Sequence, residues 1–211
     1  PLLQVHGTHH SFLFLPRHGP DHSIAPHRVN YRANIDALHG AGAAAILTVN
    51  AVGSLDRSLP PGSLALADQL IDYTWGRAHT FLDGDREPLE HVEFAEPFSH
   101  DWRVRLLQAG AACGVALRDG GCIAVTQGPR LETAAEIRRL ARDGCDLVGM
   151  TSMPEAALAR ERGLPYATLA VVANLAAGLE EAPITMDAID QALDGAMRSV
   201  RRILETLLES P

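Results

Sequence analysis

The sequence predicts an α/β fold, in which one layer of β-sheet is covered by helices. Short apolar runs alternate along the chain with segments of helical period, and the runs have the length of strands. The 211 residues contain no internal repeat, low-complexity tract or linker, so they fit one domain with a sizeable core. Strands that alternate with helices are typical of the α/β class.

The first half of the chain predicts four strands and one helix. They are a hairpin over residues 2–5 and 12–15, a helix over 30–40, and strands over 45–51 and 63–71. The hairpin turns at Gly7, and glycines at 40 and 42 end the helix. The last strand follows a Pro-Pro-Gly turn at residues 60–62.

A long loop is expected over residues 74–98. This stretch has no apolar periodicity, and it carries glycine, proline and acidic residues. Irregular segments of such length inside a compact domain are uncommon and are usually functional. We therefore predict a functional loop.

The second half of the chain shows a stronger alternation. The predicted elements are a helix over 99–112, a strand over 121–127, a helix over 133–142, a strand over 145–150, a helix over 152–163, a strand over 166–174 and a C-terminal helix. Residues 166–174 are almost continuously apolar, which indicates a strand buried on both faces. The C-terminal helix has one apolar stripe, formed by Ile189, Leu193, Met197, Val200, Leu204 and Leu207.

The start of the helix over 152–163 carries a recognisable signal. Ser152 stands at the N-cap position, Pro154 at a favoured early position, and Glu155 three residues after Ser152. This pattern predicts a capping box, in which Glu155 binds back to the N-cap backbone.

Composition narrows the classes of function. Hydrophobic residues make up 46% and charged residues 21%, an ordinary globular balance, and no apolar run approaches the roughly 20 residues of a membrane span. The net charge of −8 argues against a general nucleic-acid binder but not against an anionic substrate held locally. Cys113, Cys122 and Cys145 form no metal or redox motif, which favours free thiols and a cytoplasmic location.

Polar residues gather where predicted strands end, the place at which α/β sheets bind ligands. Arg17 and His18 could hold an anion, although an Arg-His-Gly segment can also be a solvated turn. Thr151, just before a helix, suits phosphate or acts as a plain cap. Glu132 could interact with the next helix N-terminus, and Asn174 needs hydrogen-bond partners whether or not it meets a ligand.

The histidines allow a metal hypothesis, which the spacing disfavours. Six of them, His6, His9, His10, His18, His22 and His27, stand in a segment broken by prolines, without a zinc motif. Neither a dinucleotide fingerprint, a P-loop nor a nucleophile elbow occurs. No metal or organic cofactor is therefore expected.

Five collinear segments resemble the trimeric purine nucleoside phosphorylase family, in its methylthioadenosine phosphorylase branch. They are RHGPDHSIAPHRVNYRANIDAL (17–38), TVNAVGSL (48–55), HVEFAEPF (91–98), QGPRLETAAEI (127–137) and GMTSMPEAALARERGL (149–164). The resemblance spans the chain and implies a single α/β domain with a central mixed sheet flanked by helices. It also implies a homotrimer with active sites near the subunit contacts, and phosphate as the co-substrate.

The resemblance also implies roles for individual residues. The positions implied for phosphate are Arg17, His18, Asn50, Ala51 and Thr151, and those for the base are Leu131, Glu132 and Asn174. The positions implied for the sugar and its 5′ end are Met150, His22, His91, Met186 and Ile189, with His91 reaching into a neighbouring subunit. Asn174 has the catalytic role, at N7 of the departing purine.

Two positions indicate which base is bound. Family members acting on 6-aminopurines resemble one another in having Ser at 132 and Asp at 174, whereas here Glu132 and Asn174 match 6-oxopurine enzymes. A carboxylate accepts the N1–H that hypoxanthine has and adenine lacks, and a wrong base leaves a buried polar group unpaired.

The group at the 5′ end of the sugar is indicated by a weaker local resemblance to the family. Where ordinary members hold the 5′-hydroxyl with a histidine, Met186 and Ile189 offer an apolar surface suited to a methylthio group, or simply belong to the helix core. The implied reaction is phosphorolysis of 5′-methylthioinosine to hypoxanthine and 5-methylthioribose 1-phosphate. Alternatives are phosphorolysis of methylthioadenosine or of inosine and guanosine, and an inactive nucleoside-binding member.

One family feature stands outside this sequence. Members begin with a strand and a Gly-Gly-Thr-Gly-Leu loop that contacts phosphate, and the present sequence starts at Pro1, beyond that loop. We expect that the sequence covers the protein incompletely.

Overall fold

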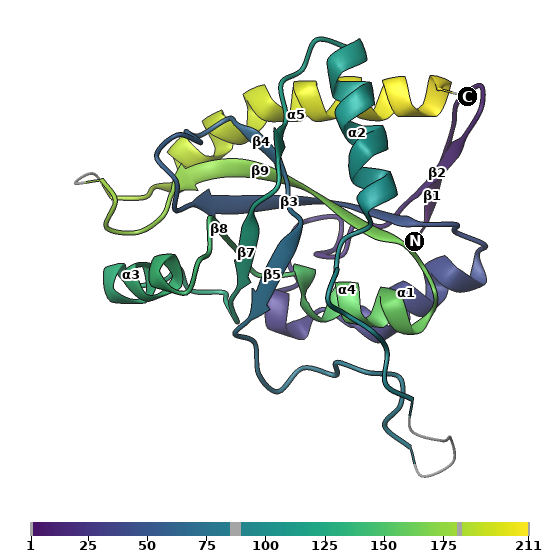
Figure 1. Ribbon diagram of the computed structural model, residues 1–211, viewed down its shortest axis with the longest axis horizontal. Helices are drawn as coiled ribbons and strands as arrows, with labels where there is room; N and C mark the ends of the chain where they lie inside the picture. The colour runs from purple at the N-terminus through teal and green to yellow at the C-terminus, as the bar shows by residue number, and fades with distance from the viewer. Residues whose placement is uncertain (1, 85–89, 181–182, 211) are drawn as a thin grey trace.

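Two long neighbouring strands, β3 (Ile46–Ser54) and β9 (Tyr166–Leu175), form the centre of the structure (Figure 1). The structure, a computed structural model, describes residues 2–84, 90–180 and 183–210. The two strands pair in parallel from Ile46 opposite Tyr166 onward, with a register shift at Val52/Gly53. This pairing places the polar ends of both strands next to each other.

Five shorter strands complete a seven-stranded sheet in the order β5-β7-β8-β3-β9-β4-β6. They are β4 (Leu64–Leu66), β5 (Gln69–Asp72), β6 (Arg118–Asp119), β7 (Cys122–Val125) and β8 (Leu147–Gly149). The sheet is mixed because β8 runs antiparallel to β3 and β4 antiparallel to β9. The predicted fold class, α/β with a central mixed sheet, is confirmed.

Helices cover both faces of the sheet, with α2 (His100–Ala112) and α5 (Met186–Glu209) on one side and α1 (Tyr31–Gly40) and α4 (Ser152–Glu161) on the other (Figure 1). A 3₁₀ turn (Pro26–Arg28) precedes α1, and α3 (Ala134–Arg142) lies beside the β7–β8 end of the sheet.

Strand β9 separates two hydrophobic cores. Tyr166, Ala170 and Val172 pack with α1 and α4, whereas Ala167, Leu169 and Val171 pack with α2 and α5. Successive strand side chains point to opposite faces, so a strand covered on both sides has to be apolar throughout. This confirms the prediction made from its continuous apolar run.

The predicted hairpin forms a separate two-stranded sheet, β1 (Leu3–His6) with β2 (Ser11–Phe14). Its turn lies against the end of α5, because a side chain at Gly7 would come within 2.6 Å of the Leu208 Cβ. The hairpin directs the chain after β2 toward Arg17 and His18.

The prediction of one strand over residues 63–71 is wrong. The segment forms β4, which pairs with β9, and β5, which pairs with β7 at the far side of the sheet. Between them the Asp68 carboxylate accepts a hydrogen bond from the Gly121 N–H at 2.8 Å. The chain thus changes sheet position within two residues, while both halves keep the apolar character of buried strands.

The predicted capping box at α4 is also wrong. Thr151 is the N-cap residue, without a side-chain capping bond, and Met153 has extended rather than helical torsion angles. The Ser152 hydroxyl accepts a hydrogen bond from Asn50. Glu155 is buried and points to Arg17, so a tertiary ion pair replaces the local bond.

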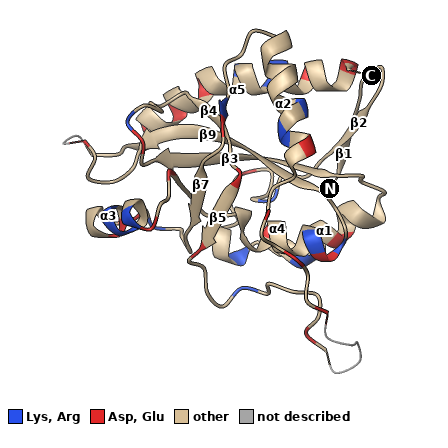
Figure 2. Cartoon of the chain, in the orientation of Figure 1, with Lys and Arg blue, Asp and Glu red and all other residues tan. Residues whose placement is uncertain are grey.

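The described part of residues 74–98 contains no helix or strand, as predicted, and Asp and Glu residues lie along the lower part of this loop in the view of Figure 2. Cys113, Cys122 and Cys145 are free. Among the described residues, none of the helices has the length and apolar character needed to cross a bilayer.

Candidate active site

A buried polar network joins the segment after β2, the middle of β3 and the start of α4. Arg17 donates from Nη1 to Glu155 at 2.5 Å and from Nη2 to the Val49 carbonyl at 3.1 Å and to Asn50 Oδ1. Asn50 donates onward to the Ser152 hydroxyl at 3.1 Å. The structure therefore brings together Arg17 and Asn50, two residues predicted for phosphate.

Glu155 is held from a second side. The Tyr166 hydroxyl, on β9, donates to the Glu155 carboxylate at 2.9 Å and accepts from Thr48 at 3.2 Å. Burial disfavours the charged guanidinium of Arg17, but Glu155 and neighbouring tyrosines outweigh it, so the pKa of Arg17 is raised. For the Tyr166 hydroxyl, whose charged form is the anion, burial raises the pKa. Arg17 is thus a fixed cation, and among the described residues its Nε has no hydrogen-bond partner.

Removal of the Glu155 carboxylate should destabilise the protein strongly. Glu155→Ala leaves the Arg17 charge buried without its partner, and we expect a loss of about 3 kcal/mol in the free energy of unfolding. Urea denaturation of the wild type, E155A, R17M and the double variant measures the coupling. A loss below about 0.5 kcal/mol in E155A would show that solvent compensates for the missing carboxylate.

His18 and His22 form a stacked pair, with ring centroids 4.6 Å apart. The His18 Nδ1 lies 2.7 Å from the Ile24 carbonyl, so Nδ1 carries the proton that this oxygen accepts. Burial lowers the pKa of His18, and the hydrogen bond to Ile24 partly opposes that effect. His22 has a positive φ of 51°, which turns the chain back over His18.

The other two residues predicted for phosphate lie close to this network in the fold. Thr151 is buried, directly before Ser152. Ala51 follows Asn50 within β3 and is exposed. Because β8 runs antiparallel to β3, its carboxyl end meets the middle of β3, and these residues lie beside Asn50 rather than beyond a strand end.

A second polar group lies where β7 ends. The Thr126 hydroxyl donates to the Glu132 carboxylate at 2.7 Å, and the Thr126 N–H donates to the Gly149 carbonyl at 2.8 Å. Met150 packs directly on Gly128, where a Cβ would lie 2.4 Å from the sulfur and φ is +58°. The residues predicted for the base and the sugar, Glu132 and Met150, are thereby tied to adjacent strand ends.

Asn174 opens onto a cavity of about 220 Å³ at the end of β9. Its Nδ2 donates to the Leu175 carbonyl at 2.8 Å, and the amide lies over Gly53 of the neighbouring strand. The register shift at Val52/Gly53 sets this position. The amide oxygen of Asn174 therefore keeps its capacity to accept a further hydrogen bond.

The remaining predicted residues are more scattered. Leu131 is 46% exposed and Met186 67% exposed, and His91 lies exposed on the long loop. Apolar side chains from Ile184 and Ala188, rather than Met186 and Ile189, line the cavity at Asn174. The structure of one chain thus leaves Leu131, Met186 and His91 open to solvent.

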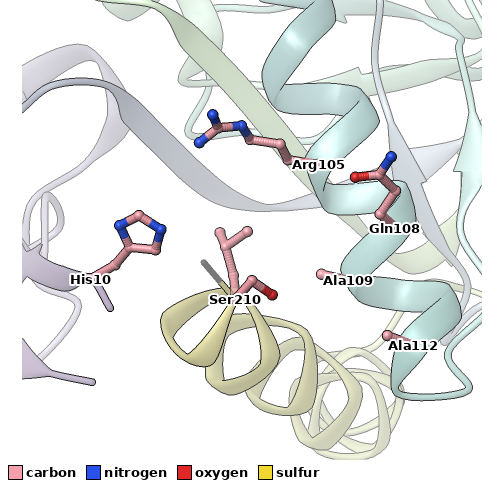
Figure 3. Close-up of a pocket in the computed structure, with 7 residues that line it drawn as sticks. His10, Arg105, Gln108, Ala109, Ala112 and Ser210 are labelled. Atoms are coloured by element: carbon pink, nitrogen blue, oxygen red, sulfur yellow. The ribbon is translucent and has the colours of Figure 1, made fainter. Parts of the chain in front are cut away.

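A larger cavity, of about 280 Å³, lies away from all these residues, between the hairpin, α2 and the end of α5 (Figure 3). His10 and Arg105 lie on opposite sides of it, and Ala109 and Leu207 are among the other residues that line it. None of the residues predicted for substrate lines it.

Sequence reasoning missed three buried polar residues beside the predicted site: Glu155, Tyr166, and Arg77, whose guanidinium donates to the Met150 and Gln127 carbonyls. Glu155 was assigned to a helix cap, Tyr166 to strand core, and Arg77 only to a loop. One signal in the sequence could have pointed to them. Each is a charged or phenolic side chain within an apolar or functional segment, and such a group needs polar partners if it is buried. Their partners could not be read from local sequence.

Comparisons with known proteins agree in family and fold. A family model described as "Phosphorylase superfamily" matches residues 4–209. A probable S-methyl-5′-thioinosine phosphorylase of Pseudomonas syringae pv. tomato is 55% identical over 198 residues, which cover 94% of this chain and 80% of that protein. The 6-oxopurine nucleoside phosphorylase of Pyrococcus furiosus is 42% identical over 196 residues, covering 90% of this chain and 74% of its own length.

Solved structures show the same architecture. The methylthioadenosine phosphorylase of Schistosoma mansoni in complex with adenine superposes with a TM-score of 0.93 at 33% identity, over 98% of this chain and 78% of that one. A point variant of the Schistosoma enzyme in complex with methylthioadenosine gives a TM-score of 0.91 at 32% identity, over 98% and 78%.

Proposed function

The chain belongs to the phosphorylase superfamily, and from that premise we propose that it cleaves 5′-methylthioinosine with phosphate, giving hypoxanthine and 5-methylthioribose 1-phosphate. As an enzyme it is a pentosyltransferase of the purine nucleoside phosphorylase type. The single observation that carries the choice of base is the pair Glu132, in the segment after β7, and Asn174, at the end of β9.

Hypoxanthine and adenine differ in the hydrogen bonds that they can form with Glu132 and Asn174. Glu132 accepts the N1–H of hypoxanthine while the Thr126 hydroxyl donates to one of its two carboxylate oxygens, and adenine has no proton at N1. Asn174 accepts from a protonated N7, and its amide donates to the 6-oxo oxygen. The 6-oxopurine phosphorylase of Pyrococcus furiosus, among the relatives, supports this base class.

The proposal also specifies the group at the 5′ end of the sugar, a methylthio group rather than a hydroxyl. A methylthio group prefers an apolar wall, which Ile184 and Ala188 supply in the cavity at Asn174, with Met186 and Ile189 on the adjoining turn of α5. Relatives named S-methyl-5′-thioinosine phosphorylase at 52–55% identity support this choice over plain inosine.

The mechanism follows from the two polar groups. Phosphate is held by Arg17, His18 and Thr151 beneath C1′ of the sugar. As the glycosidic bond lengthens, positive charge grows on the sugar ring and negative charge on the purine. The phosphate dianion offsets the first, and a proton at N7, which the Asn174 amide oxygen accepts, neutralises the second. A phosphate oxygen bonds to C1′ as the bond from C1′ to the purine breaks, and the proton that hydrogen phosphate loses on becoming an ester reaches the purine through solvent.

Phosphate affinity should fall as pH rises, through His18. Nδ1–H is taken by Ile24, so only the protonated imidazole can donate Nε2–H to phosphate, and the free-enzyme pKa of His18 lies below its ordinary value. Affinity is then greatest below that pKa and declines by about tenfold above it. The phosphate KM, measured across pH in the wild type and in His18→Gln, checks this.

The second ionisation of phosphate also changes the phosphate KM with pH, and it affects the wild type and the variant equally. The variant therefore serves as the control. The glutamine variant keeps a neutral donor, so its pH profile should retain only that ionisation. Identical profiles for the two proteins would remove His18 from the phosphate site.

We also propose a homotrimer in which each chain covers the open side of its neighbour's site. Trp75 is exposed, as are Leu131 and Met186, and the backbone of Trp75 is bound to Gln127 beside the base residues. Light scattering combined with size exclusion measures the mass. A monomer with full activity would contradict this assembly and the role of His91 in a neighbouring site.

A substrate panel tests the function. Phosphate-dependent release of base from 5′-methylthioinosine, inosine, methylthioadenosine and adenosine is compared by kcat/KM. We expect 5′-methylthioinosine to exceed inosine by about tenfold or more, the value of one apolar contact, and to exceed methylthioadenosine by far more. Equal rates on inosine would contradict the methylthio pocket, and a preference for methylthioadenosine would contradict the base assignment.

A further inference from the structure

Arg77, in the long loop after β5, is buried without a carboxylate partner. The residue is 8% exposed, and no ion pair to it occurs among the residues that the structure describes. Burial lowers its pKa, partly opposed by the charges of Tyr31 and Asp72. A guanidinium in such a place needs several hydrogen-bond acceptors, and here these are main-chain carbonyls.

The main-chain acceptors come from two segments that carry or adjoin the proposed substrate residues. Arg77 Nη1 donates to the Met150 carbonyl at 2.8 Å and to the Met153 carbonyl at 2.5 Å, on either side of Thr151. Its Nη2 donates to the Gln127 carbonyl at 2.9 Å and more weakly to that of Thr126 at 3.3 Å. Nε and Nη1 also reach the Gln127 side chain and the Tyr31 hydroxyl.

These bonds fix the direction of the next N–H groups. In a planar trans peptide the C=O and the N–H point in opposite directions. Arg77 draws the Met150 carbonyl toward itself, so the Thr151 N–H points away from Arg77, and the Gly128 N–H does likewise. Within the described part of the chain, neither N–H has a hydrogen-bond partner.

We propose that Arg77 is a positioning residue that holds the Thr151 N–H in place as a phosphate donor and keeps the Thr126–Glu132 base segment in register with it. The inference rests on the proposed function. Arginine suits the task because its planar fork carries five N–H donors, whereas lysine has three on a flexible stem. Arg77 touches neither phosphate nor nucleoside, and it acts through the peptide groups that it orients.

The test compares Arg77→Ala and Arg77→Lys with the wild type. Phosphate affinity is measured by calorimetry without nucleoside, and kcat and both KM values by turnover. We expect phosphate Kd and KM to rise about tenfold or more in R77A and less in R77K, because one oriented donor is lost. The KM for the nucleoside should change less than the KM for phosphate.

Two controls separate positioning from folding. Arg103→Lys changes a largely buried arginine of α2 that pairs with Asp119 of β6, outside the site, and should leave phosphate affinity unchanged. Guanidinium chloride, at concentrations well below denaturing ones, should restore part of the phosphate affinity of R77A, whereas equal sodium chloride should not. R77K serves in place of R77A if the alanine variant does not fold.

Phosphate Kd values within twofold of the wild type in folded R77K and R77A would overturn the proposal. So would a loss of affinity in R77A that guanidinium does not restore at all. If the wild type binds phosphate but releases no purine, the proposed function fails, and the comparison of Kd values still decides the role of Arg77.

Discussion

Asn174→Ala is expected to lower kcat by about 100- to 1000-fold, because in the proposed reaction the amide holds the proton at N7 of the purine, where negative charge would otherwise develop. The side chain stands at the end of β9 over Gly53 and opens onto the cavity of about 220 Å³. In the ground state the purine N7 carries little charge, so the amide binds the departing base more tightly than the intact nucleoside. The KM values should therefore change little.

Steady-state kinetics with 5′-methylthioinosine measures this effect, and Asn34→Ala on α1 is the matched control. Asn34 lies on the outer helix layer, away from the cavity. A fall in kcat/KM that came entirely from KM would assign Asn174 to ground-state binding. Unchanged kcat would remove it from the reaction.

The double change Glu132→Ser with Asn174→Asp is expected to reverse base preference. Serine at 132 no longer provides the acceptor that requires N1–H, and a carboxyl at 174 can accept from the 6-amino group of adenine while it donates to N7 in its protonated form. The ratio of kcat/KM for 5′-methylthioinosine over methylthioadenosine should fall by about three orders of magnitude, since mismatched bases leave buried groups unpaired.

The single variants show whether the two positions act together. Glu132→Ser alone should lose activity on 5′-methylthioinosine without gaining much on methylthioadenosine, because Asn174 still matches a 6-oxo base. A ratio in the double variant within tenfold of the wild type would place base selection in other residues, and Thr126, which binds Glu132, would be the first to examine.

Much of the fold was accessible from the sequence, because its signals are local. The apolar run of residues 166–174 predicted a strand with two buried faces, and β9 lies between two cores. The prediction of one strand over residues 63–71 was wrong because the change of partner strand is not a local signal. Its two halves have the same apolar character, and only the hydrogen bond between Asp68 and Gly121 shows where the chain changes partner.

The residues of the candidate site also fall into two groups, those visible in the sequence and those that only the structure reveals. Arg17, Glu132 and Asn174 could be proposed from the sequence, since polar residues near the ends of apolar runs are visible without a structure, and Asn50 could be proposed from the family resemblance. Their neighbours could not. Glu155 stands in a capping-box pattern, yet its carboxylate meets Arg17, 138 positions away along the chain.

The sequence by itself determined the order of strands and helices, the buried faces, and the residue types available for phosphate and purine. These follow from periodicity and side-chain chemistry, which act over a few residues. Only the tertiary structure decided that Glu155 and Tyr166 anchor Arg17, and that Arg77 binds the carbonyls on both sides of Thr151. The reason is physical: a buried charge takes whichever partners the packed sheet brings to it, and local sequence does not specify those distant partners.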